Sequence, residues 1–85
     1  MKIPKSVKIG GIVYKVDIVP MGDDLGQTDF RTSEIRISKD LNDNQKLASF
    51  IHEAIHCVNT QLTEEQVDYL ALSINQIIVD NKLFK

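Results

Sequence analysis

Residues 49–56 read SFIHEAIH, so a His-Glu-x-x-His pattern lies inside an apolar sequence that is typical of a helix. On a helix, residues four apart lie one above the other on the same face. His52 and His56 are therefore placed to offer two imidazole nitrogens to one metal ion. Glu53 lies a little further round the same side, where its carboxylate would hold and deprotonate a metal-bound water rather than bind the metal. This is the arrangement that the metalloprotease signature requires.

Helical angles place the two histidines away from the main apolar face of this segment. At about 100° per residue, five apolar residues gather in one arc: Leu47, Phe50, Ile51, Ala54 and Val58. His52 and His56 fall almost opposite this arc, and Glu53 lies between. The histidines either face water or lie under a second element that covers them and leaves a cleft. A suitable element follows immediately, which favours the cleft and a metal site.

Length and charge limit the class of protein. With 85 residues, the chain is expected to form one domain, residues 1–85, whose core is so small that a metal ion or a partner would help to stabilise it. The net charge is -2 and the basic residues form no stripe, so nucleic acid is not an expected partner. A catalytic or binding cleft is the better expectation.

The single cysteine, Cys57, excludes an intramolecular disulfide and fits a reducing compartment. Its helical angle lies at the edge of the apolar arc, which predicts a small buried hydrophobe rather than a ligand or a nucleophile. The sequence contains no apolar run that fits a signal peptide or a bilayer span. We therefore expect a cytoplasmic protein without a membrane partner.

The N-terminal half predicts two β-hairpins. Residues 7–19 alternate apolar and polar side chains around Gly10-Gly11, a turn that pairs Ile9 with Ile12 and Val7 with Tyr14. Six apolar residues then share one face: Val7, Ile9, Ile12, Tyr14, Val16 and Ile18. A second hairpin is expected from residues 28–31 and 34–38 around Thr32-Ser33. There Arg31 would face Glu34, and the apolar face would gain Phe30, Ile35 and Ile37.

Two helices are expected to follow the strands. The first begins near Asn42, with Gln45 as its capping-box partner, and ends at about Val58. The second has Thr63 as its cap and Gln66 as the box partner, and Leu62 is expected to pack against Val67. Its predicted buried stripe consists of Val67, Leu70, Ala71, Ile74 and Ile78. The fold class is therefore α+β, a small antiparallel sheet of two hairpins followed by two antiparallel helices.

A third protein ligand is expected, because catalytic zinc usually takes three and leaves one position for water. The metzincin spacing needs a histidine where the chain has Leu62 and a glycine where it has Asn59, so that subclass is disfavoured. Glu64 and Glu65 at the start of the second helix are better placed. A short connection makes the two helices antiparallel and returns the chain beside the first.

Helix geometry separates the two glutamates. Glu64 lies nearer the apolar stripe of its helix, and hence nearer the first helix, whereas Glu65 points further out. We therefore predict His52, His56 and Glu64 as metal ligands, with Glu65 as the alternative third ligand. Asp68, one turn after Glu64, is predicted to accept a hydrogen bond from a ligating histidine. The alternative is that both glutamates only complement the positive end of the helix dipole.

The segment HEAIH at residues 52–56, followed by TEEQV at 63–67 and a helix containing Leu70-Ala71, resembles small zincin-type metallopeptidase-like proteins of phages and prophages. It is similar, more distantly, to gluzincins, in which a downstream glutamate is the third ligand and an acidic residue four positions later supports the site. Glu64 and Asp68 match that spacing.

The resemblance implies a minimal zinc-dependent peptidase fold with Zn2+ as cofactor and a peptide or protein as substrate. It also implies a sheet edge to which an extended peptide could add as a strand. Residues of a type that could stabilise an oxyanion are Tyr14, Tyr69, Arg31 and Arg36.

Two functions fit these observations. The first is a zinc-dependent metallopeptidase, in which a zinc-bound water is activated by Glu53 as general base. The second is a non-catalytic, zinc-stabilised protein-interaction module, which the small size favours. Glu53 distinguishes the two, because a purely structural zinc site does not require a carboxylate beside its first histidine.

Overall fold

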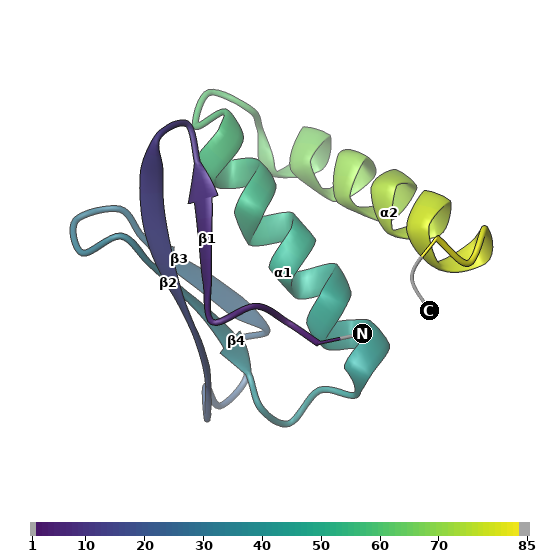
Figure 1. The fold of residues 1–85 in the computed structure, drawn as a ribbon, viewed down its shortest axis with the longest axis horizontal. Coiled ribbons are helices and arrows are strands. Elements are labelled where there is room, and N and C mark those ends of the chain that lie inside the picture. Colours follow the sequence, from purple (N-terminus) through teal and green to yellow (C-terminus); the bar gives the residue numbers. More distant parts are fainter. Residues whose placement is uncertain (1, 84–85) are drawn as a thin grey trace.

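A computed structural model describes residues 2–83 of the chain. The elements in order are β1 (Ser6–Ile9), β2 (Ile12–Val19), β3 (Gly26–Asp29), β4 (Glu34–Ser38), α1 (Asp43–Val58) and α2 (Glu64–Asp80). The sheet lies on one side of α1 and α2 lies on the other, so α1 is the middle layer (Figure 1). The predicted α+β class is confirmed. Within residues 2–83, neither helix has the length and hydropathy needed to cross a bilayer.

The first hairpin has the predicted register. Ile9 lies opposite Ile12 and Val7 lies opposite Tyr14 in the antiparallel pair β1–β2. Gly10 and Gly11 have φ values of 58° and 83°, which side-chain-bearing residues rarely adopt and which a tight two-residue turn requires. The Gly-Gly turn therefore determines which residues of β2 face the core.

The prediction of a purely antiparallel sheet is wrong, because the sheet is mixed. Its strand order is β1-β2-β4-β3, and β2 pairs with β4 in parallel, with Val16 opposite Ile35. The loop after β2 carries β3 to the edge, so β4 inserts between them. This order suits the side chains: β4 contributes Ile35 and Ile37, both fully buried, whereas the polar β3 occupies the edge.

The second hairpin is also displaced from the predicted one. β3 spans Gly26–Asp29, and Asp29 rather than Arg31 lies opposite Glu34. The Asp29 carboxylate accepts hydrogen bonds from the backbone N–H groups of Arg31 and Thr32, which ends the strand early and forms an Asx turn. As a result, Phe30 lies in the turn and is 51% exposed instead of joining the apolar face.

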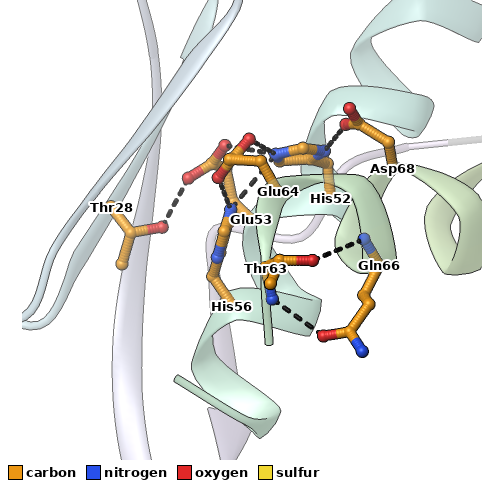
Figure 2. Close-up of polar contacts among 8 residues, drawn as sticks. All are labelled: Thr28, His52, Glu53, His56, Thr63, Glu64, Gln66 and Asp68. Carbon is orange, nitrogen blue, oxygen red and sulfur yellow. Dashed lines mark hydrogen bonds and ion pairs between the residues drawn. The ribbon is translucent and has the colours of Figure 1, made fainter. Parts of the chain in front are cut away.

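Both helices begin at the predicted caps. The side chains of Asn42 and Thr63 each accept a hydrogen bond from the backbone N–H three residues later, and the side-chain oxygens of Gln45 and Gln66 accept one from the cap N–H. The Thr63–Gln66 pair is visible in Figure 2. These reciprocal bonds set the first helical residue of α2 at Glu64.

Helix α1 is covered on two sides. Towards α2, three of its apolar residues pack against Val67 and Ala71: Leu47, Ile51 and Ile55. Towards the sheet, Phe50 and Cys57 pack against the cluster of Tyr14, Val16, Ile35 and Ile37. The two apolar clusters thus lie on either side of one helix and determine its orientation.

Ile12 and Ile18 near the ends of β2, predicted to join the apolar face of the sheet, are 49% and 43% exposed, and three helix residues predicted to be buried are exposed too. Val58 lies in the last turn of α1 and is 70% exposed, while Leu70 and Ile74 of α2 are 39% and 37% exposed. Among the described elements, α2 packs against α1 alone. A single neighbouring helix covers only a narrow line of α2, here Val67 and Ala71, so residues beside that line remain accessible to solvent.

Gly26 allows α1 to approach the edge strand closely. A Cβ atom added at Gly26 would overlap the Ser49 Oγ atom of α1, which now donates a hydrogen bond of 3.0 Å to the carbonyl oxygen of Leu25. Because Gly26 has no side chain, α1 can come close enough for this hydrogen bond, which links the start of β3 to α1.

We predict that Gly26→Ala lowers the free energy of unfolding by about 1–3 kcal/mol, because the Ser49 hydroxyl must turn away and lose its hydrogen bond. In a Ser49→Ala background, the same substitution should cost clearly less. Denaturant unfolding of the four proteins of this cycle gives the coupling free energy. Equal costs in both backgrounds would show that Gly26 and Ser49 do not limit each other.

Candidate metal centre

The two histidines converge from successive turns of α1. The Nε2 atoms of His52 and His56 lie 3.2 Å apart, and their rings meet edge to face with centroids 4.9 Å apart. The side chains are 22% and 20% exposed, so they are sheltered but accessible from one side. The spacing of one helical turn produces this pairing, as the sequence indicates.

Glu64 of α2 closes the group from the other helix. Its Oε1 atom lies 2.7 Å from Nε2 of His56, and its Oε2 atom lies 3.4 Å from Nε2 of His52 (Figure 2). In the described part of the chain, these three residues form a group with ligand atoms all within 4.8 Å of one another. Because Glu64 is the first residue after the capped start of α2, the cap and the packing of Val67 place its carboxylate over the histidines.

The donor atoms fit a tetrahedral metal ion. Zinc bonds of about 2.0–2.1 Å at tetrahedral angles put neighbouring donors about 3.3 Å apart. Here the two imidazole nitrogens lie 3.2 Å apart, and each lies near a different oxygen of the Glu64 carboxylate, at 2.7 Å for His56 and 3.4 Å for His52. Two imidazoles and one carboxylate are also a donor set that suits transition metals rather than Mg2+ or Ca2+, which prefer oxygen alone. The triad of His52, His56 and Glu64 is therefore a candidate metal-binding site.

The triad is open towards solvent. The Glu64 side chain is 70% exposed, in contrast to the sheltered histidines. Three protein ligands leave one position of a tetrahedral ion free, whereas structural zinc sites usually fill all four with protein. The fourth position of a tetrahedral ion held by these three residues would therefore be accessible to solvent.

Asp68 lies behind His52, on the side away from the triad. Its Oδ1 atom is 3.1 Å from Nδ1 of His52 (Figure 2). A neutral imidazole that donates its Nδ1–H to this carboxylate keeps the lone pair of Nε2 directed at the triad. The contact is the one that the Glu-x-x-x-Asp spacing predicts, and the supporting role of Asp68 remains a prediction.

Glu53 is a buried carboxylate beside the triad. The residue is 8% exposed, its Oε1 atom accepts a hydrogen bond of 2.7 Å from the Thr28 hydroxyl, and its Oε2 atom lies 3.9 Å from Nε2 of His52. The hydrogen bond holds one oxygen against β3, while the other faces the histidines. Glu53 is therefore outside the triad but next to it, as a proton acceptor would be.

Sequence reasoning missed Thr28. It lies 25 residues before Glu53, on a polar strand without any metal or catalytic motif. Only the sheet order, which places β3 at the edge beside α1, brings its hydroxyl to the carboxylate. Thr28 could have been found only by predicting that its strand is the edge strand beside α1, and the predicted sheet of two antiparallel hairpins did not specify this position.

The remaining candidates lie elsewhere. Arg31 and Arg36 form ion pairs with Asp29 and Glu34, and Tyr69 is 72% exposed on α2. Tyr14 is buried in the sheet cluster, where it contacts Cys57. Burial raises the pKa of the Cys57 thiol, and this partly buried side chain packs against the sheet cluster, so the predicted burial is only partial. Glu65 is exposed and is not part of the converging group.

Comparisons with protein-family models, curated proteins and solved structures found no match for this chain. The fold and the triad therefore define it only as an α+β protein with a mixed four-stranded sheet, two packed helices and a candidate metal centre.

The choice between neighbouring glutamates gives a matched test of the triad. We predict that Glu64→Ala weakens zinc binding at least about tenfold, because it removes one of three protein ligands. Glu65→Ala should leave zinc affinity unchanged and alter stability by roughly 0.3–1 kcal/mol through the helix dipole. Competition titration with a zinc-sensitive dye measures both affinities, and His52→Ala provides the reference for a lost imidazole. Loss of zinc in Glu65→Ala with retention in Glu64→Ala would reverse the assignment.

Proposed function

We propose that this protein is a zinc-dependent metallopeptidase of the small, zincin-like and gluzincin-like kind that its His-Glu-x-x-His sequence resembles. In this proposal His52, His56 and Glu64 hold Zn2+, Asp68 orients His52, and Glu53 is the catalytic general base. The geometry of the triad supports the metal, and the placement of Glu53 supports the chemistry.

The observation that carries the proposal is the burial of Glu53. A buried carboxylate is unfavourable unless it is compensated, and the hydrogen bond that it accepts from a side chain is the one from Thr28. A protein that used zinc only for stability would not need this unfavourable burial of a carboxylate. A carboxylate beside a metal ion with a free position is the arrangement that a hydrolase requires.

Bound zinc would polarise the scissile carbonyl and lower the pKa of the attacking water. The residues of the chain supply the proton transfers. The Oε2 atom of Glu53 takes a proton from the water and passes it to the leaving amine. Thr28 holds the Oε1 atom, so that Oε2 remains directed at the reacting groups. Glu53 thus acts first as base and then as acid without changing its position.

A peptide or protein is the substrate that suits the surroundings of the triad. β3 is an edge strand and carries Thr28, so a peptide that added to this edge would pass the carboxylate of Glu53. Main-chain hydrogen bonds along β3 would hold such a substrate extended, with its scissile bond beside the metal. The single cysteine, which excludes an intramolecular disulfide, favours action in a reducing compartment such as the cytoplasm.

One observation favours the second function, a non-catalytic protein-interaction module stabilised by zinc. The outer face of α2 exposes several apolar side chains, of which Tyr69 and Ile77 are 72% and 55% exposed. Such a face could receive a partner. The same face is compatible with a peptidase, however, whereas a pure interaction module does not require a buried carboxylate beside the two histidines. The peptidase is therefore the preferred proposal.

The proposal predicts that Glu53→Gln removes peptidase activity, by at least about 100-fold, and leaves fold and zinc content intact. The amide keeps the shape, and its oxygen still accepts the Thr28 hydrogen bond, but it cannot take a proton. Cleavage of a broad peptide library by zinc-loaded protein measures the activity. Elemental analysis and thermal unfolding measure zinc content and fold.

Glu65→Gln is the matched control, because it makes the same chemical change on an exposed glutamate. This variant should cleave peptides at the wild-type rate. Activity that survives in Glu53→Gln would rule out Glu53 as the base. A zinc-loaded wild type that cleaves nothing in the library would favour the interaction module.

A further inference from the structure

A cleft of about 420 Å³ adjoins the candidate metal centre. His52, Glu53 and Asp68 form one end of it, and it continues between the N-terminal half of α1, the middle of α2 and the start of β3. The step from His52 back to Gln45 on α1 corresponds to about 10 Å along the helix. The cleft is thus long and wide enough for one large side chain.

The walls of the cleft are mainly apolar. They include Leu25, Leu41, Ala48, Ala71 and Leu72, and Gly26 and the uncharged polar residues Gln45, Ser49 and Asn75 also line the cleft. The charged residues present, Glu53 and Asp68, lie at the end shared with the metal centre and are already in contact with Thr28 and His52. A charged side chain inside the cleft would therefore find no opposite charge along its walls.

Part of this apolar wall is not covered by the fold. Leu25 and Leu72 are 62% and 58% exposed although both line the cleft. Apolar surface in this position becomes favourable when a ligand group removes it from water. His52 and Glu53 line the cleft and also lie at the candidate metal centre. A ligand bound at the metal centre could therefore place one of its side chains in the cleft.

We propose that this cleft is a specificity subsite that receives one large apolar side chain, such as leucine, methionine or phenylalanine, from the substrate residue next to the scissile bond. The inference rests on the proposed peptidase function and adds the class of substrate. Leu72 is the specificity-determining residue on α2, and the side chain enters from the end formed by His52 and Glu53.

The test uses two probes of similar size and different polarity, N-acetyl-leucine methylamide and N-acetyl-asparagine methylamide. They are titrated into the wild-type protein, with and without zinc, and binding is followed through methyl resonances by nuclear magnetic resonance. The leucine probe should shift the methyl signals of Leu25, Leu41, Ala48 and Leu72 and leave those of Ile77 unchanged. It should bind at least about tenfold more tightly than the asparagine probe.

Leu72→Ala and Ile77→Ala form a matched pair on α2, because the two residues are 58% and 55% exposed and only Leu72 lines the cleft. Leu72→Ala should weaken binding of the leucine probe about threefold or more, and Ile77→Ala should not change it. Equal affinity for both probes, or an equal loss in both variants, would overturn the inference.

The probe experiment separates this inference from the proposed function, because probe binding requires neither zinc nor hydrolysis. If the protein binds the leucine probe in the cleft but cleaves no peptide, the apolar binding site is supported and the peptidase function is contradicted. If the protein cleaves peptides without a preference for large apolar residues, the peptidase function is supported and the specificity subsite is contradicted.

Discussion

The packing of α2 against α1 is the interaction on which the candidate site depends. Val67 and Ala71 lie against Leu47, Ile51 and Ile55, and this small apolar contact holds the start of one helix over the last turns of the other. The Thr63–Gln66 capping box then determines which residue opens α2, so that Glu64 presents its carboxylate to both histidines. Neither helix alone contains the triad, and a metal ion bound there would link the two helices. Metal binding and helix packing should therefore stabilise each other.

The sheet contributes the second part of the site. Because β4 inserts between β2 and β3, the polar strand β3 is placed at the edge and along α1, where Gly26 permits the close approach and Thr28 meets Glu53. A buried carboxylate held in this way has one oxygen fixed and the other directed at the histidines. The same edge strand and the apolar cleft beside it surround the triad with the surfaces that a peptide substrate would need.

Local features of the sequence predicted much of this structure. The helical spacing of His52 and His56, the two capping boxes and the Gly10-Gly11 turn each involve residues within a few positions of one another, where geometry follows directly from residue type. The parallel pairing of β2 with β4 was not predictable in this way, since it depends on which strand buries its isoleucines best. The Thr28 contact with Glu53 follows from that pairing and was missed with it. The exposure of Leu70 and Ile74 depends on how little of α2 its single neighbour covers.

The central claim is that His52, His56 and Glu64 bind one metal ion and leave a position open. X-ray absorption at the zinc edge of the zinc-loaded protein tests it most directly, because the spectrum reports the number and kind of ligand atoms. We predict about four nitrogen and oxygen neighbours at about 2.0–2.1 Å, with the multiple scattering of two imidazoles and without sulfur at about 2.3 Å. A shell of oxygen alone, a sulfur neighbour, or the signal of fewer than two imidazoles would contradict the account.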